Sequence, residues 1–137
     1  MVKFICGKKG SGKTKQLINM ANDSAENVTG GVVFIEATNK HSLELNYKIR
    51  YINAMEFNID KINTFYGLLC GIVASDYDVQ KVYIDGLYKM IELDFYLLEK
   101  FIEYLRVIDK HNETEFIISV ECEKQDVPEN MKKYLVN

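Results

Sequence analysis

Eight residues near the start of the chain have the types and the spacing that bind phosphate groups. The segment Gly7–Thr14 reads Gly-Lys-Lys-Gly-Ser-Gly-Lys-Thr and matches the pattern G-x-x-x-x-G-K-[ST]. In this pattern the glycines permit a tight turn whose backbone N–H groups point at phosphate oxygens. The charge of Lys13 suits the β- and γ-phosphates, and the Thr14 hydroxyl suits Mg²⁺. The residues expected to bind phosphate are Gly7, Lys9, Gly10, Ser11, Gly12, Lys13, Thr14 and Lys15.

The residues on either side of this segment have the patterns that such a loop requires. Val2–Cys6 is a short apolar run that predicts a strand ending directly before Gly7. After Thr14, apolar residues recur at helical spacing as far as Ala25, which predicts a helix beginning near Lys13. Phosphates would lie at the N-terminus of this helix, where free N–H groups and the helix dipole favour anions. A glycine-rich turn without a ligand is the alternative, and the strand–loop–helix context disfavours it.

A candidate metal ligand lies at the end of a later apolar run. Residues 81–85 read Lys-Val-Tyr-Ile-Asp, which predicts a strand with Asp85 at its carboxyl tip. An aspartate in this position can hold Mg²⁺ beside a phosphate-binding loop. An aspartate that merely opens a turn with Gly86 is the alternative. Because the complete loop is present, we expect Thr14 and Asp85 to bind the metal.

The rest of the chain alternates predicted strands with predicted helices. Strands are expected at residues 2–6, 32–35, 48–52, 81–85 and 115–120. Helical spacing of apolar residues follows Asp60 and Asp94, and each aspartate is expected to cap its helix. The tail predicts a short helix from Val127, with 134–136 as a candidate last strand. This alternation predicts an α/β fold, namely a doubly wound parallel sheet of about five strands flanked by helices in three layers.

Length and composition limit the class of protein. With 137 residues, the chain is expected to form a single domain over residues 1–137. A net charge of −3 argues against nucleic acid as a partner, and no apolar run reaches the length of a membrane span. The 3 cysteines lack the spacing of a disulfide framework or a zinc site, and no signal peptide is visible. These features predict a cytoplasmic protein that does not bind membranes.

With the loop at 7–14 and the aspartate at 85, the chain resembles the P-loop NTPase superfamily. The loop corresponds to the Walker A motif of this superfamily, and the strand ending at Asp85 resembles its Walker B strand. Within the superfamily, the chain is most similar to small additional-strand, RecA-like ATPases, because no Asn-Lys-x-Asp guanine signature is present. The strand at 116–120 resembles the sensor strand of these ATPases. The resemblance implies ATP and Mg²⁺ as cofactors, with Ser119 or Glu121 as a polar group near the γ-phosphate.

The chain departs from this family in the residues that hydrolysis needs. Many additional-strand ATPases have a glutamate directly after the Walker B aspartate, whereas this chain has Gly86. Some RecA-like proteins carry the glutamate at the end of the strand after the first helix, and Glu36 matches that position. The resemblance therefore makes Lys13 and Glu36 the candidate catalytic residues, with Glu36 as the base. A solvated strand end is the alternative for Glu36. The sequence places neither of its arginines, Arg50 and Arg106, near the phosphates.

Two functions from different classes remain open. One is a Mg-dependent ATPase with weak or partner-stimulated hydrolysis. The other is a nucleotide-dependent module that senses ATP without turnover and binds a protein partner or a second copy of itself. A small-molecule kinase is disfavoured, because the chain is too short to include a lid. His41 and His111 have no second ligand at metal spacing, and neither is expected to have a direct role.

Overall fold

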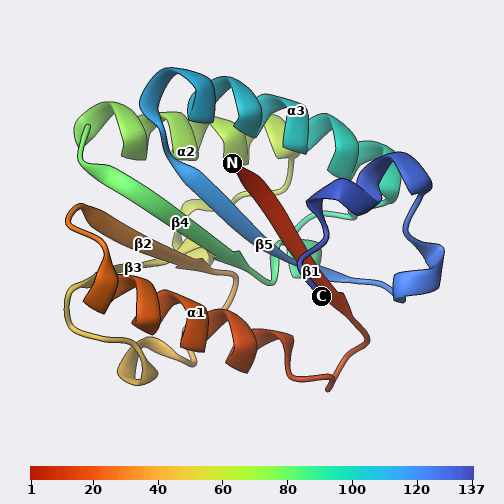
Figure 1. Ribbon diagram of the computed structural model, residues 1–137, viewed down its shortest axis with the longest axis horizontal. Helices are drawn as coiled ribbons and strands as arrows, with labels where there is room; N and C mark the ends of the chain where they lie inside the picture. Colours follow the sequence, from red (N-terminus) through yellow and green to blue (C-terminus); the bar gives the residue numbers. More distant parts are fainter.

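A computed structural model describes residues 1–137 and shows a five-stranded sheet between two layers of helices (Figure 1). All strands are parallel, and their order across the sheet is β1-β5-β4-β2-β3. The strands are β1 (Val2–Gly7), β2 (Gly31–Glu36), β3 (Ile49–Asn53), β4 (Val79–Asp85) and β5 (Glu115–Glu121). The predicted α/β fold, with a parallel sheet of five strands in three layers, is confirmed.

The helices cover both faces of the sheet. The α-helices are α1 (Lys13–Asn27), α2 (Ile62–Ser75) and α3 (Phe95–Asn112). Helix α1 lies on one face, and α2 and α3 lie side by side on the other (Figure 1). The 3-10 helices are η1 (Ser42–Glu44), η2 (Ala54–Phe57), η3 (Leu87–Lys89), η4 (Lys124–Asp126) and η5 (Glu129–Tyr134). None of the helices combines the length and the apolar character that crossing a membrane would require.

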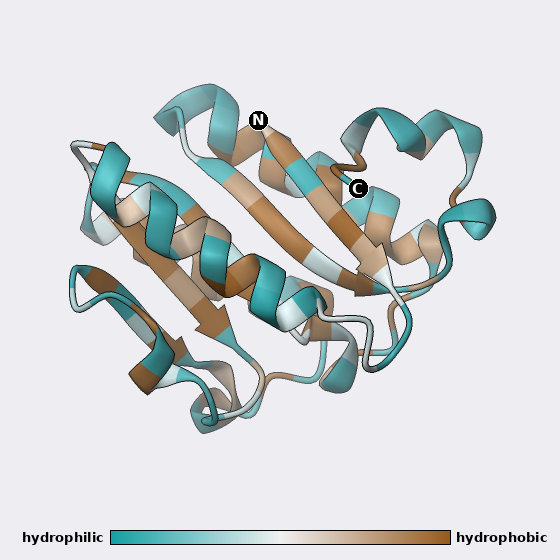
Figure 2. Cartoon of the chain, turned by 60° about the horizontal axis from the view of Figure 1, so that its bottom comes forward, coloured by the Kyte–Doolittle hydropathy of each residue, from teal (hydrophilic) through white to brown (hydrophobic).

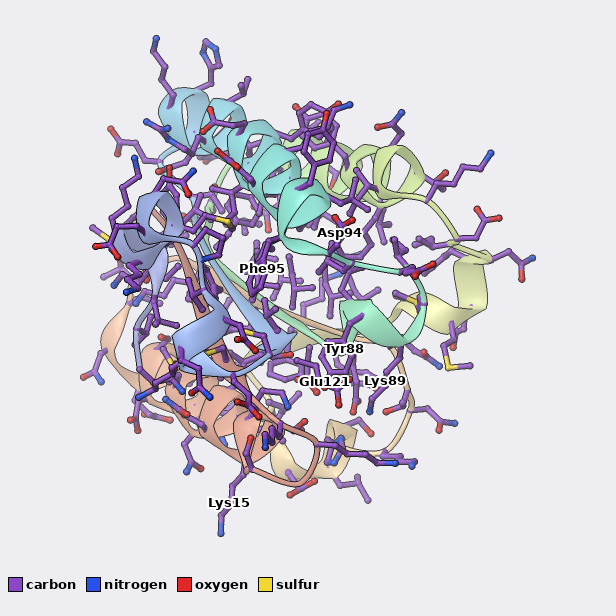
Figure 3. All side chains as sticks on the ribbon, turned by 90° about the vertical axis from the view of Figure 1, so that its right-hand side faces the viewer. Lys15, Tyr88, Lys89, Asp94, Phe95 and Glu121 are labelled. Atoms are coloured by element: carbon purple, nitrogen blue, oxygen red, sulfur yellow. The ribbon has the colours of Figure 1, made fainter.

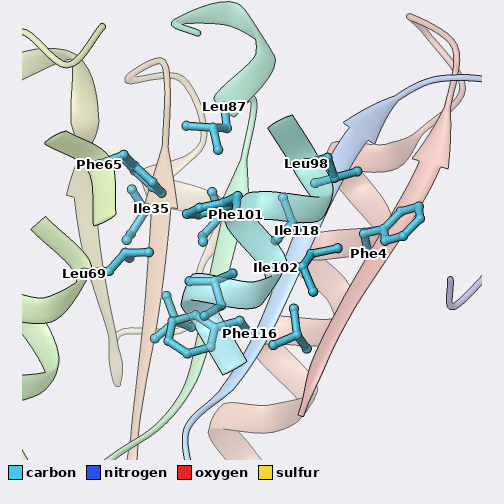
Figure 4. Close-up of a cluster of buried hydrophobic side chains, with 14 of the residues drawn as sticks. Phe4, Ile35, Phe65, Leu69, Leu87, Leu98, Phe101, Ile102, Phe116 and Ile118 are labelled. Atoms are coloured by element: carbon cyan, nitrogen blue, oxygen red, sulfur yellow. The ribbon is translucent and has the colours of Figure 1, made fainter. Parts of the chain in front are cut away.

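Successive side chains of each strand point into two separate cores, one on each face of the sheet. The larger core lies under α2 and α3, where the ring centroids of Phe65 and Phe101 are 5.8 Å apart (Figure 4). The smaller core lies under α1 and includes Leu17 and Phe34. Figure 2 shows apolar strands behind the hydrophilic outer side of α1. Each helix packs its apolar side against one face of the sheet. This packing fixes the sheet between the two helical layers, and the sheet in turn holds the strand tips in place.

Strand β5 lies between β1, which leads into the loop at residues 7–14, and β4, which carries Asp85. It pairs with β1 through Ile118 and Phe4, and with β4 through Ile118 and Ile84. Because all strands are parallel, the loop after β1 and Asp85 at the end of β4 lie at the same edge of the sheet. The outer edge of β1 is covered by the tail, in which Leu135 forms an isolated parallel bridge with Phe4. The candidate last strand at 134–136 is thus only a single bridge.

The two predicted helix caps have different outcomes. Asp94 precedes α3, and its side chain accepts a hydrogen bond of 2.8 Å from the backbone N–H of Leu97. The prediction that Asp60 caps α2 is wrong, because that helix begins at Ile62 directly after Lys61 and no side chain caps it. A capping side chain has to stand immediately before the first helical residue, and Asp60 is one position too early.

Candidate functional site

The loop between β1 and α1 has a backbone that requires glycine. Gly10 and Gly12 have φ angles of 81° and 89°, in the left-handed region that other residues rarely adopt. A Cβ at Gly7 would lie 3.2 Å from the Cγ of Lys13 and closer still to the side chain of Ser11. The turn is closed by a hydrogen bond of 3.0 Å from the N–H of Ser11 to the carbonyl of Lys8. The glycines that matched the pattern therefore each meet a steric requirement of this turn.

Lys13 lies inside the loop rather than in solvent. The residue is only 6% exposed, and its Nζ donates a hydrogen bond of 3.0 Å to the carbonyl of Lys8. The same ammonium group lies 5.6 Å from the ring centroid of Tyr88. No carboxylate forms an ion pair with Lys13. Its positive charge is therefore held near the loop without being neutralised, as binding of an anion requires.

Thr14 and Asp85, the predicted metal ligands, are brought together across the sheet. The Thr14 Oγ1 donates a hydrogen bond of 2.9 Å to Oδ2 of Asp85. The other carboxylate oxygen accepts a bond of 2.7 Å from the Ser119 hydroxyl, which itself accepts one of 3.1 Å from the Gly86 N–H. Two adjacent oxygen donors fit Mg²⁺, which commonly takes one or two protein ligands and completes its shell with phosphate and water. No group of three or more His, Cys, Asp or Glu residues forms a metal cage.

Glu36, the predicted catalytic base, is enclosed by its own hydrogen-bond partners. It is 1% exposed, so a solvated strand end is ruled out. Its carboxylate accepts hydrogen bonds from the Tyr51 hydroxyl at 2.6 Å, the Thr38 hydroxyl at 2.8 Å and the ring Nδ1 of His41. Burial raises the pKa of this carboxyl group, but the hydrogen bonds outweigh burial, and the pKa of Glu36 is lowered. The residue does not line the cavity described next.

A cavity of about 890 Å³ opens over the loop, large enough for a nucleotide-sized ligand. Of the predicted phosphate-binding residues, its wall includes Lys9, Gly10, Gly12, Lys13, Thr14 and Lys15. The remaining wall comes from Ile18, His41, Glu44, Tyr88, Lys89 and Glu121. Figure 3 shows Tyr88, Lys89 and Glu121 next to one another at this end of the sheet, while the side chain of Lys15 points outward.

Five of these wall residues are not predicted by the sequence to be functional, namely Ile18, His41, Glu44, Tyr88 and Lys89. His41 was expected to have no direct role, yet it lies in the wall. Tyr88 and Lys89 belong to η3, which begins directly after Gly86. Burial, together with the charges of Asp85 and Glu121, raises the pKa of Tyr88 to about 12. The sequence signal that could have identified Tyr88 and Lys89 is their closeness to Asp85, because η3 follows the strand tip that carries this candidate metal ligand.

The cavity contains lysines but no arginine. Arg106 lies on the exposed side of α3 and pairs with Glu103 at 3.2 Å, and Arg50 is exposed on β3. No protein-family model matches this chain, and no curated protein matches it. The case for a function of this site therefore depends on its geometry.

Proposed function

We propose that this protein binds ATP together with Mg²⁺ in the cavity over Gly7–Thr14. The observation that carries the proposal is the hydrogen bond of 2.9 Å between Thr14 and Asp85. It unites the hydroxyl of the loop with the carboxylate of a strand tip, at the point where a phosphate loop and its metal ligand must meet. Bound Mg²⁺ would neutralise phosphate charge there, with Thr14 and Asp85 as its protein ligands.

The strand order supports placing the chain with the additional-strand, RecA-like P-loop NTPases. In this branch an extra strand separates the Walker A strand from the Walker B strand. Strand β5 has that position here, between β1 and β4. Its Ser119 also contacts Asp85, as a sensor-strand residue near the metal would. The free state of Cys6, Cys70 and Cys122 is compatible with the cytoplasm as the compartment that we propose.

Hydrolysis is proposed to be weak on its own and to depend on a partner. Phosphoryl transfer needs a group that orients water and positive charge on the transition state, often from an arginine. Gly86 follows the metal-binding aspartate, and the Glu36 carboxylate is already engaged by other side chains. No arginine lines the cavity. A protein partner or a second copy of the chain is the natural source of the missing arginine.

A protein-binding module that senses ATP is the second candidate, and the contact between Lys13 and Tyr88 favours it. A bound triphosphate would compete with the Lys8 carbonyl and the Tyr88 ring for the ammonium group of Lys13. Occupancy of the loop would thereby alter the contacts of η3. Such a segment can present a different surface to a partner in the filled and empty states without any turnover.

Calorimetric titration of the protein with ATP and MgCl₂ tests the proposal. We expect Lys13→Ala to weaken binding at least ~10-fold, because a charged hydrogen-bond donor is lost. The matched control is Lys100→Ala, which removes an exposed lysine of α3 and should leave the affinity unchanged. Absence of ATP binding by the unaltered protein, or equal affinity in all three proteins, would refute the proposal. Phosphate release separates the two candidates, since a sensor shows none even with its partner present.

A further inference from the structure

We propose that His41 recognises the terminal phosphate of a bound nucleoside triphosphate, and that Glu36 is the positioning residue that orients its imidazole ring. This inference rests on the proposed binding of ATP. It adds the residue that lets the cavity distinguish a triphosphate from a diphosphate.

His41 is held on one side by the buried carboxylate of Glu36. Its ring Nδ1 is hydrogen-bonded to Oε1 of Glu36, and its backbone N–H donates a bond of 3.4 Å to Oε2. Both the ring and the main chain are thus fixed by one carboxylate. The side chain of His41 is still 28% exposed, and the residue lines the cavity. A fixed ring that retains access to the cavity is suited to contacting a ligand.

The second ring nitrogen of His41, Nε2, makes no hydrogen bond within the protein and is therefore available for that contact. Its nearest charged neighbour is Oε2 of Glu44, at 3.9 Å. The side chain of Glu44 is 58% exposed, so this carboxylate is an easily displaced partner. With Nδ1 engaged by Glu36, Nε2 is the nitrogen that can donate a hydrogen bond to a phosphate oxygen when the ring is protonated.

The loop that carries His41 lies beside the strand tip where the terminal phosphate of a bound nucleotide is expected. This loop follows β2, whose last residue Glu36 is the register partner of Asp85. The loop is tied to the tip of β4 by a hydrogen bond of 3.1 Å from the Ala37 N–H to the carbonyl of Asp85. Mg²⁺ held by Thr14 and Asp85 would lie beside the phosphates at the tip of β4, so we place the terminal phosphate at this end of the cavity.

The burial of Glu36 also points to a role beyond the fold. Burial of a carboxylate is unfavourable unless the group is paired, and an apolar side chain would complete the sheet at lower cost. What the carboxylate adds is the orientation of a ring whose other nitrogen faces a ligand. Carboxylate–histidine pairs have this function in many sites, because the hydrogen bond fixes the orientation of the ring.

Titration with two ligands tests the role of His41. The probes are ADP and the hydrolysis-resistant β,γ-imido analogue of ATP, both with MgCl₂. We expect His41→Gln to weaken binding of the triphosphate analogue ~10-fold and to leave ADP binding within about twofold, since only the terminal contact is lost. The control is His111→Gln, which changes the other, exposed histidine and should alter neither affinity. A triphosphate-to-diphosphate ratio that is the same in His41→Gln as in the unaltered protein would overturn the inference.

NMR of the two histidine rings gives an independent test. The ring signals of His41 should move more with the triphosphate analogue than with ADP, while those of His111 stay in place. Glu36→Gln keeps the size of the side chain but removes its charge, and we expect it to reduce this difference and the affinity ratio together. If Glu36→Gln lowers the melting temperature but preserves both readouts, Glu36 is structural only and the positioning role is overturned.

The outcomes for the two proposals can be told apart. If the unaltered protein binds neither ligand, the proposed ATP site fails, and this inference fails with it. If the protein binds both ligands and Lys13→Ala weakens both, the ATP site stands. In that case an unchanged ratio in His41→Gln contradicts only the recognition role of His41.

Discussion

Glu36 and Asp85 are paired in register at the carboxyl tips of β2 and β4, yet their carboxylates have different partners. Asp85 accepts hydrogen bonds from Thr14 of the phosphate loop and from Ser119. Glu36 instead accepts hydrogen bonds from β3 and from the loop that follows β2, including the ring of His41. Two neighbouring acids of the same sheet edge thus belong to separate hydrogen-bond networks. Their separate substitution should give separate phenotypes.

Asp85→Asn should weaken the magnesium-dependent part of ATP binding. The amide keeps the shape of the carboxylate but removes the charge that attracts the metal. We expect the gain in affinity on adding MgCl₂ to fall by about 10-fold, while binding in EDTA changes little. The control Asp78→Asn makes the same change at an exposed residue before the other end of β4. If calorimetry finds that MgCl₂ raises the ATP affinity of Asp85→Asn as much as that of the unaltered protein, a metal-binding role of Asp85 is contradicted.

Glu36 should make the stability of the fold sensitive to acid. Its pKa is lowered from the ordinary value of 4.5, because hydrogen bonds outweigh burial. A lowered pKa in the folded state means that the stabilisation is complete above the unfolded pKa and is lost as the pH falls through the folded pKa. We therefore expect Glu36→Gln to be less stable than the unaltered protein at neutral pH, with the gap narrowing below about pH 4.5. Urea unfolding at a series of pH values measures the difference in free energy of unfolding between the two proteins. A difference that stays constant with pH would contradict the stabilising role of the Glu36 carboxylate.

The cap of α3 should contribute measurable stability. The Asp94 side chain satisfies the N–H of Leu97, so Asp94→Ala should cost about 1 kcal/mol and lower the melting temperature by roughly 4 °C. Asp60→Ala removes an exposed aspartate that caps nothing, and its effect should stay within about 0.5 kcal/mol. Thermal unfolding of the two variants provides the comparison. Equal losses would show that the Asp94 hydrogen bond does not stabilise the helix.

Glycine-to-alanine changes should have opposite signs in the loop and in α2. Gly12 has a φ angle of 89°, so Gly12→Ala should destabilise the protein by about 1–2 kcal/mol and weaken nucleotide binding. Gly67 lies within α2, where an added Cβ would meet nothing within 4 Å, so Gly67→Ala should stabilise by roughly 0.5–1 kcal/mol. Denaturant unfolding and ATP titration of both variants are the measurements. A neutral Gly12→Ala would mean that the loop adopts another backbone conformation.

The sequence predicted those parts of the fold and site that depend on local patterns. Apolar runs located the strands, and the glycines and Lys13 located the loop, because each pattern has a fixed backbone consequence. Asp85 was found because an acid at the end of a buried strand must lie at the edge of the sheet. The structure brings it to Thr14 as that argument required.

The residues that the sequence missed depend on which strands are neighbours. His41 reaches the cavity because β2 lies beside β4, and strand order is set by packing over the whole chain rather than by any local pattern. The burial of Glu36 likewise depends on Tyr51, which comes from the adjacent edge strand β3. A single sequence predicts where a strand ends, but it does not predict which side chains from neighbouring strands and loops pack over that end. For this reason the sequence alone does not distinguish a catalytic position of Glu36 from a solvated one.

The pairing of β1 with β5 has a consequence for the order in which the protein is made. Val2 pairs with Phe116, which lies 114 residues further along the chain. The phosphate loop is therefore synthesised first, but its strand gains a sheet neighbour only after β5 has left the ribosome. Such distant pairings are slow steps of folding, because a long segment must be closed before the contact forms. Because β5 also lies between β1 and β4, Thr14 and Asp85 can come together in their final positions only after the entire sheet has been completed.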